Sequence, residues 1–311
     1  MWKLEEVLIP TQAELFSMLC EKYKGKVIFC KGNFILVKGD APIMLVAHLD
    51  TVHEQAVKNI CKTADGNILM SPQGIGGDDR CGVYALAKIY ELSKVKPFLL
   101  FTCNEEIGGI GAQKFCTAHQ QGKLPVELDN LKCIVEIDRK GKKDAVYYDC
   151  DNPDFEKYIS SKGFQTDYGT FSDISVIAPE LEIAAVNLSS GYYNAHTLHE
   201  YIKLNQLERT ISKVIEIVAD ASQENFPKYV YSEYQKTFYL NRFSSFDEEE
   251  FEKKILLADL PKKYKKFYKD FFDYYTAEDI QEFKKNFDKQ WAEFLYQDFL
   301  SMLAYEFDGE K

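Results

Sequence analysis

The sequence PIMLVAHLDT, residues 42–51, runs from a continuous apolar stretch into a histidine and an aspartate. A short apolar run of this kind, bounded by polar residues, is typical of a strand that is buried on both faces. We therefore expect a strand over Pro42–His48, with His48 and Asp50 at its carboxyl end. Because open α/β sheets place their sites outside the carboxyl ends of strands, both residues are candidates for a functional site.

Five further apolar runs predict strands, and helical patterns lie between them. The strands are expected over Lys26–Cys30, Asn33–Val37, Pro97–Cys103, Cys133–Ile137 and Ile183–Leu188. The helices are expected over Thr11–Tyr23, Arg80–Leu92, Gly111–His119, Phe155–Ser161 and Leu204–Ala221. Thr11 and Glu14 match a capping box at the start of the first helix. Buried strands separated by helices predict an α/β fold, a three-layer sandwich with a mostly parallel central sheet.

Composition and charge exclude several classes of protein. Of the 311 residues, 46% are apolar and 28% are charged, which is the usual mix of a folded globular protein. Asp and Glu outnumber Lys and Arg by 49 to 38, and the net charge of −11 argues against nucleic acid or an anionic membrane as a partner. No apolar run approaches the roughly 20 residues of a membrane span, and the N-terminal MWKLEEVLIP has acids where a secretory signal has an apolar stretch. We expect a cytoplasmic protein.

The eight cysteines form no C-x-x-C pair, and several lie inside apolar runs. In a chain of this length they are expected to be reduced and mostly buried. Cys81 and Cys103 flank candidate site residues and are expected to belong to the core.

Residues 226–311 differ in composition from the rest of the chain. They hold 24 of the 44 aromatic residues, interleaved with Lys and Glu at helical spacing. Thr276 can cap a helix in which Ile280, Phe283 and Phe287 share one face. We therefore expect an α/β domain over 1–225 and a helical C-terminal subdomain over 226–311. This subdomain either packs on the α/β domain or serves as a lid, an oligomer contact or a partner surface, and the aromatic residues do not distinguish these roles.

Five short segments carry carboxylates or histidines at expected strand ends. They are AHLDT (His48, Asp50), GIGGDDRCG (Asp78, Asp79), TCNEEIGG (Glu105, Glu106), VEIDR (Asp138) and NAHTLHE (His196, His199). So many acids would repel one another unless cations neutralised them. Imidazole and carboxylate ligands together suit zinc, with manganese or cobalt as substitutes. Each segment alone has a structural explanation, such as Asp78 or Asp79 capping the next helix, but together they indicate a metal site.

The ordered set H-x-D, D-D-R-x-G, E-E, D and a late H resembles the di-zinc exopeptidase superfamily, which includes aminopeptidases, tripeptidases and the carboxypeptidase and aminoacylase relatives. The resemblance covers roughly residues 40–215. It implies that His48 and Asp138 bind one metal, that Glu106 and His196 bind the other, and that Asp78 bridges them.

The resemblance also implies roles for two residues that bind no metal. Asp50 would orient the His48 ring, and Glu105 would be the general base. Many relatives have a cis peptide bond at the position of Asp78–Asp79, and the sequence alone does not decide whether this chain has one.

Several alternatives stay open at this point. Asp79 could replace Asp78 as the bridge, although the spacing from Asp78 to Gly82 favours Asp78. His199 could replace His196, although the spacing from His196 to Glu200 favours His196. His53 is expected at the rim of the site. Asp173 is expected to cap a helix rather than to bind a metal.

The intervals between the candidate ligands are 30, 28, 32 and 58 residues, in chain order from His48 to His196. These leave no room for the inserted domains of the larger relatives, so the resemblance is to the compact, lidless aminopeptidases. The expected function is that of a binuclear zinc hydrolase that cleaves an amide bond, most simply an aminopeptidase on short peptides. The alternatives are an N-deacylase of a small acylated metabolite and a binding or scaffold protein with an inert site. An oligomer formed through the C-terminal region is compatible with each.

Overall fold

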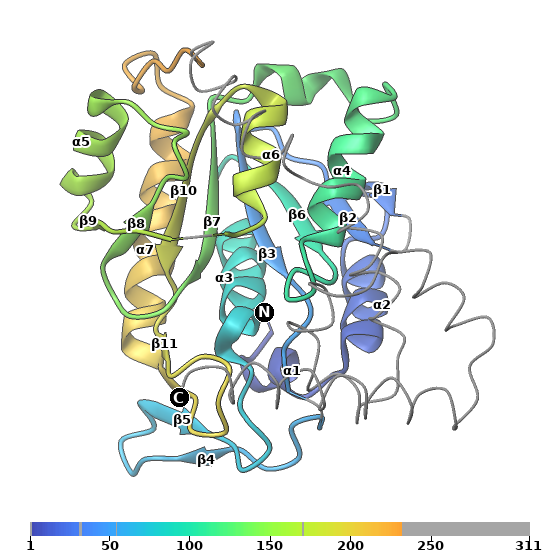
Figure 1. Cartoon of the computed structure of the whole chain (residues 1–311), viewed down its shortest axis with the longest axis vertical. Coiled ribbons are helices and arrows are strands. Elements are labelled where there is room, and N and C mark those ends of the chain that lie inside the picture. Colours follow the sequence, from blue (N-terminus) through green and yellow to red (C-terminus); the bar gives the residue numbers. More distant parts are fainter. Residues whose placement is uncertain (1, 31–32, 54, 170, 232–311) are drawn as a thin grey trace, which may run out of the picture. The chain divides into compact units, whose positions relative to one another are not determined.

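The computed structural model describes residues 2–30, 33–53, 55–169 and 171–231, whose centre is an eight-stranded sheet (Figure 1). The strand order is β1-β2-β6-β3-β7-β10-β8-β9. In chain order these strands are β1 Val27–Cys30, β2 Phe34–Val37, β3 Ile43–His48, β6 Phe98–Thr102, β7 Cys133–Arg139, β8 Asp144–Val146, β9 Gln165–Thr166 and β10 Ala184–Ser189. The central strands β6, β3, β7 and β10 are parallel, whereas β1, β2 and β8 form antiparallel pairs. The expected mostly parallel sheet is confirmed, as are all six expected strands.

The central strand β3 explains why residues 42–47 are apolar without a break. Side chains alternate between the two faces of a strand. Ile43, Leu45 and Ala47 lie in the hydrophobic core on one face of the sheet, and Met44 and Val46 lie in the core on the other. Because both faces are covered, neither set can be polar.

Helices supply the other side of each core. The first core contains residues of α1 Glu5–Leu8, α2 Gln12–Lys22, α3 Gly77–Leu92, α5 Pro153–Ser161 and α7 Leu204–Ala221. The second contains residues of α4 Ile110–Gln120, α6 Ile174–Leu181 and the 3₁₀ helix Val126–Asn130. The structure is therefore a three-layer α/β sandwich (Figure 1).

Side-chain capping hydrogen bonds fix the N-terminal ends of two of the expected helices. The Thr11 hydroxyl accepts a hydrogen bond from the Glu14 backbone N–H, and the Glu14 carboxylate accepts one from the Thr11 N–H, so the capping box is confirmed. Asn152 caps α5 by accepting a hydrogen bond from the Phe155 N–H. All five expected helices are present.

A second, smaller sheet was not predicted. Its strands are β4 Cys61–Lys62, β5 Ile68–Met70, β11 Tyr192–Tyr193 and β12 Tyr201–Lys203, in the antiparallel order β11-β12-β5-β4. Strands of two or three residues carry no readable periodicity, which is why the sequence does not reveal them. This sheet joins the segment that precedes α3 to the segment that follows β10, and both segments carry candidate site residues.

Phe226 extends the α/β core beyond residue 225, because its ring packs against Phe155 and Tyr158. The expected helical subdomain falls mainly on residues 232–311, outside the described residues, and stays a prediction. Five of the cysteines in the described part are buried, Cys81 and Cys103 among them. No helix among the described residues is long and apolar enough to cross a membrane. The cytoplasmic location stays a prediction.

Candidate metal centre

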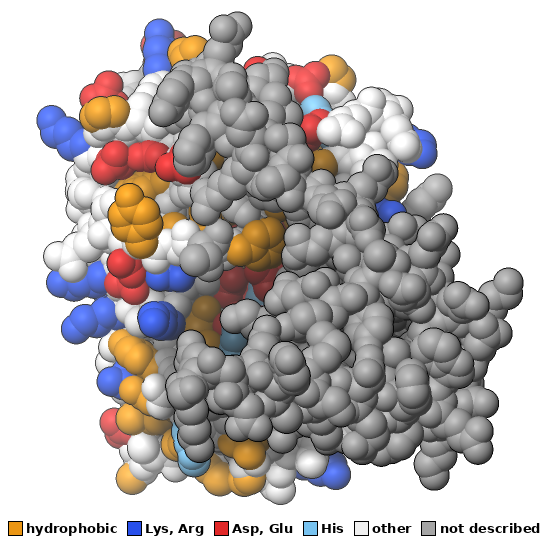
Figure 2. All heavy atoms as spheres, viewed as in Figure 1, with side chains coloured by type: hydrophobic (Ala, Val, Ile, Leu, Met, Phe, Trp, Pro, Cys, Tyr) orange, Lys and Arg blue, Asp and Glu red, His pale blue; other side chains and the backbone are white. Residues whose placement is uncertain are grey.

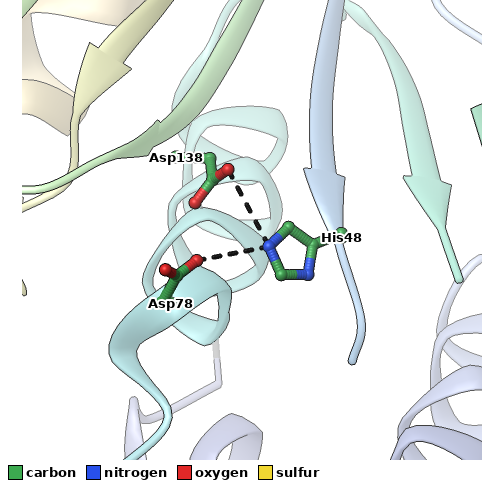
Figure 3. A group of neighbouring side chains, drawn as sticks. All are labelled: His48, Asp78 and Asp138. Atoms are coloured by element: carbon green, nitrogen blue, oxygen red, sulfur yellow. Dashed lines mark hydrogen bonds and ion pairs between the residues drawn. The ribbon is translucent and has the colours of Figure 1, made fainter. Parts of the chain in front are cut away.

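His48 is the last residue of β3, and its side chain is only 1% exposed. Its Nε2 lies 3.3 Å from Asp78 Oδ1 and 3.8 Å from Asp138 Oδ2 (Figure 3). Asp78 comes from the first turn of α3 and Asp138 from the end of β7, so three elements bring these side chains together. Ligand atoms bound at 2.0–2.1 Å in a tetrahedral zinc site lie roughly 3.3 Å apart. The spacing of these three side chains fits a metal ion.

A second group lies on the other side of Asp78. His196 Nε2 is 3.2 Å from Asp78 Oδ2 and 3.1 Å from Glu106 Oε1. The His196 side chain is 54% exposed, in contrast to that of His48. Asp78 therefore offers one carboxylate oxygen to each group, as a bridging ligand would. Acidic and histidine side chains are visible next to one another at the centre of one face (Figure 2).

The non-helical backbone of the first turn of α3 directs Asp78 and Asp79 to opposite sides. The peptide bond between them is cis. The Asp79 carboxylate is fully buried and accepts hydrogen bonds from the backbone N–H groups of His48 and Gly82, so it holds β3 to the start of α3. Asp79 thus has the structural role that the sequence left open, and Asp78 is the residue that faces both histidines.

Glu105 and Glu106 diverge in the same way, and Asp50 fixes the turn that separates them. The Asp50 carboxylate accepts hydrogen bonds of 3.0 Å from the backbone N–H groups of both glutamates. It also lies 3.4 Å from His48 Nδ1. Glu106 reaches His196, whereas Glu105 Oε2 lies 3.9 Å from His48 Nε2. Ligand atoms of Glu105, Glu106 and His48 also come within 4.8 Å of one another.

Three residues that sequence reasoning missed hold the candidate ligands in place. Asn187 on β10 accepts a hydrogen bond of 2.8 Å from the Asp138 N–H, and the Tyr192 hydroxyl donates one of 3.2 Å to Asp138 Oδ1. Glu200 is fully buried and accepts a hydrogen bond of 2.9 Å from the Asp78 N–H. The spacing from His196 to Glu200 was the one signal in the sequence that pointed to any of them.

Charges within the cluster favour cations. Hydrogen bonds to Asp78 and Glu106 raise the pKa of His196 to about 10. Burial alone would lower the pKa of His48, but Asp138, Asp50 and Asp78 outweigh it and raise that pKa well above its usual value. Burial would raise the pKa of Asp78, but the two histidines hold it below its usual range. The carboxylates therefore stabilise positive charge at both imidazole positions, which is what a site for divalent cations requires.

A further pair of acids, Glu136 and Asp173, lies behind the site. Burial raises the pKa of Glu136 to about 8 and that of Asp173 to about 6. Ser172 donates a hydrogen bond to Glu136, and Thr102 donates one to Asp173. Asp173 is the N-cap residue of α6 and belongs to none of the candidate ligand groups, as expected, but its side chain makes no capping hydrogen bond.

Two further histidines named in the sequence analysis, His199 and His53, lie outside the two candidate ligand groups. His199 is exposed and lies in neither group. His53 was expected at the rim, and its Nε2 is bonded at 2.8 Å to the buried Glu200, and its side chain is 7% exposed. His53 belongs to none of the candidate ligand groups and lines a pocket together with His196, so it borders the site as expected, with its ring held by a buried carboxylate.

No protein-family model matches the chain, and no curated protein matches it in sequence. Solved structures do match. Aminopeptidase PepT from Bacillus cereus is 15% identical with a TM-score of 0.54, over 71% of this chain and 97% of its own. A tripeptidase from Staphylococcus aureus is 16% identical with a TM-score of 0.54, over 70% and 96% of the two chains. An aminopeptidase from the archaeon Desulfurococcus kamchatkensis is 15% identical with a TM-score of 0.51, over 70% and 94%. The chain has an aminopeptidase fold.

The aminopeptidase fold confirms the resemblance drawn from the five segments as a likeness of fold. Within this structure, residues of the five segments lie close together, and their donor set can be tested against a metal. His48, Asp78 and Asp138 form one group, and Asp78, Glu106 and His196 form another, each with ligand atoms within 4.8 Å of one another. Each group combines imidazole nitrogen with carboxylate oxygen, a donor set that zinc accepts. The residues present fit a pair of divalent cations.

Proposed function

We propose that this protein is a binuclear zinc hydrolase that cleaves an amide bond, and that it acts as an aminopeptidase on short peptides. The observation that carries the proposal is the pair of ligand groups that share Asp78, with Glu105 beside them. Shared carboxylates of this kind suit two cations a few ångströms apart, an arrangement that would serve amide hydrolysis by activating the attacking water and polarising the carbonyl oxygen.

Each residue then has a role. His48 and Asp138 would hold one zinc ion, Glu106 and His196 the other, and Asp78 both. Asp50 would keep the His48 ring in place, because its carboxylate faces Nδ1 and leaves Nε2 toward the cation.

Glu105 would be the general base. Zinc, when bound, lowers the pKa of a water molecule and polarises the amide carbonyl. Glu105 accepts the proton of the attacking water at its carboxylate and returns it to the leaving amine nitrogen. Burial raises the pKa of Glu105 well above its usual value, and Asp173 and Glu106 add to the effect, which makes its carboxylate a stronger base than that of an exposed glutamate.

The chain between Asp138 and His196 supports a substrate that enters without an inserted domain. This segment contains β8, α5, β9, α6 and β10, which all belong to the sandwich. A short peptide could therefore reach His196, whose side chain is half-exposed.

The test is mass spectrometry of the zinc-loaded protein incubated with matched peptides, half with free N-termini and half N-acylated. Stepwise loss of N-terminal residues from the free set supports an aminopeptidase. Release of the acyl group alone would instead indicate an N-deacylase. Unchanged peptides in both sets, with two zinc ions bound per chain, would favour a binding or scaffold protein.

Glu105→Gln separates chemistry from metal binding. We expect a loss of about 10²- to 10⁴-fold in turnover with the zinc content kept. Glu127→Gln is the matched control, because Glu127 is exposed on the 3₁₀ helix. Full activity of Glu105→Gln would remove Glu105 from the mechanism.

A further inference from the structure

A pocket of about 430 Å³ opens beside His196, on the exposed side of the candidate metal centre. Three segments form its wall: the chain after β3, the chain after β5 and the segment before β12. The lining residues are Val52, His53, Gln55, Pro72, Gln73, His196, Thr197 and Leu198. Because His196 belongs both to this wall and to a ligand group, a molecule in the pocket lies next to the site of the proposed reaction.

Among the residues that the structure describes, the lining carries no ionisable side chain other than its two histidines. None of the described residues in the wall is Asp, Glu, Lys or Arg. Val52 and Leu198 expose large apolar side chains there, and the Leu198 residue is 61% exposed. A charged group in this pocket would lose water without gaining an opposite charge, which is unfavourable.

His53 is a fixed part of the wall. Its Nε2 is bonded to Glu200, and its ring lies against the backbone of Gly74. A Cβ at residue 74 would lie 2.2 Å from His53 Nδ1, so only glycine permits this close approach. The Glu200 that holds His53 also binds the Asp78 N–H, so the wall is tied to the ligand that both groups share.

Gln73 gives the wall a directed hydrogen-bond donor. Its Oε1 accepts hydrogen bonds from the backbone N–H groups of Lys58 and Asn59 and from the Ser71 hydroxyl. Three donors at one atom assign that atom as the oxygen. The Nε2 hydrogens are what this side chain can offer to a carbonyl group in the pocket.

We propose that this pocket binds the side chain of a substrate residue next to the cleaved amide, and that it selects an uncharged side chain, aliphatic or amide-bearing. The selection rests on the proposed function of the neighbouring centre. An aliphatic side chain contacts Val52, Pro72 and Leu198, and the carbonyl of an amide side chain accepts from Gln73. Acidic and basic side chains are disfavoured.

The first test uses two peptide series with the zinc-loaded full chain. One series varies the N-terminal residue and the other the second residue among Leu, Gln, Lys and Glu. We expect kcat/KM in one series to be at least about 10-fold higher for Leu and Gln than for Lys and Glu. Equal rates for all four residues in both series, while cleavage proceeds, would overturn the pocket proposal and leave the proposed function standing.

Leu198→Glu tests whether the residues that line this pocket determine the side-chain preference of the enzyme. The new carboxylate should raise kcat/KM for Lys relative to Glu by about 5-fold, and Leu198→Lys should reverse the preference. Leu92→Glu is the matched control: Leu92 is 49% exposed at the far end of α3 and should leave the preference unchanged. A preference that Leu198→Glu and Leu198→Lys do not move would remove this pocket from substrate selection.

A binding measurement keeps the two proposals separable. The zinc-loaded Glu105→Gln protein, with and without Leu198→Glu, is titrated with the amides of leucine, glutamine, lysine and glutamic acid. Tighter binding of the uncharged amides, shifted by Leu198→Glu toward the lysine amide, supports the pocket even if no peptide is cleaved. Equal binding of all four amides overturns it.

Discussion

The carboxylate of Glu200 accepts a hydrogen bond of 2.9 Å from the backbone N–H of Asp78, the residue shared by both ligand groups. Its second oxygen accepts from the Gly76 N–H at 3.0 Å and faces His53 Nε2 at 2.8 Å. Glu200 lies at the end of the segment that carries His196. One fully buried side chain therefore links the segment before α3 to the segment before β12.

Glu200→Ala should lower both stability and activity. It leaves two buried N–H donors without an acceptor, which destabilises by about 1–3 kcal/mol for each donor. Urea unfolding of the zinc-free protein measures this loss. Glu216→Ala, at an exposed position on α7, should change the free energy of unfolding by less than about 0.5 kcal/mol. An unchanged midpoint for Glu200→Ala would mean that water or another group satisfies these donors.

Asp50→Asn should weaken metal binding without removing a ligand. The amide oxygen can still accept one hydrogen bond, but the second N–H of the Glu105–Glu106 turn loses its acceptor, and His48 loses the charge beside Nδ1. Loss of such a partner reduces metal affinity or activity by about 10- to 100-fold. Competition with a chromophoric chelator measures the affinity. Asp129→Asn, at an exposed position, is the control, and equal affinities for the two variants would contradict the positioning role of Asp50.

Zinc binding should release protons at neutral pH. Hydrogen bonds to Asp78 and Glu106 raise the pKa of His196 to about 10, so this imidazole carries a proton at pH 7 in the zinc-free protein. Zinc binds the neutral ring, so the apparent affinity should rise with pH up to about pH 10.

Calorimetry in buffers of different ionisation enthalpy counts the released protons. His196→Ala should release about one proton fewer than the unchanged protein. His199→Ala should release the same number as the unchanged protein, because the exposed His199 lies in neither group. Identical proton counts for the two variants would place His196 outside the site.

The sequence predicted the central sheet and its main helices because their signals are local. The run over 42–47 is apolar on both faces of β3, and the capping box at Thr11 is complete within four residues. The same locality explains what it missed. The strands of the small sheet are too short for a pattern, and Asn187, Tyr192 and Glu200 act through partners far away in the chain.

The site was predictable in outline because strand ends converge at one edge of a parallel sheet. The spacing from Asp78 to Gly82 also favoured Asp78 over Asp79, but the backbone geometry that turns the two side chains apart could not be predicted from the sequence. Asp79 points to the N–H groups of His48 and Gly82, and Asp78 to the two histidines. The ring of His53 could not be placed from sequence either, because its position depends on Gly74 and Glu200.

Glu136→Gln should stabilise the zinc-free protein at high pH. Burial raises the pKa of Glu136 from its usual value of 4.5 to about 8, so the folded state holds a proton that the unfolded state has released. The free energy of unfolding therefore falls as the pH rises from 4.5 to about 8, by up to about 1.4 kcal/mol per pH unit. Below pH 4.5 both states are protonated, and the group has no effect.

The difference in the free energy of unfolding between Glu136→Gln and the unchanged protein isolates the contribution of Glu136 from that of the other titrating acids. We expect it to be small at pH 4.5, to grow in favour of the variant up to about pH 8, and then to level off. Urea unfolding at a series of pH values in the presence of a chelator measures it. Glutamine keeps the shape of the side chain and an oxygen for the Ser172 hydroxyl, so little repacking is involved. Glu127→Gln, on the surface, should show a flat difference. A flat difference for Glu136→Gln as well would mean that folding does not raise the pKa of Glu136.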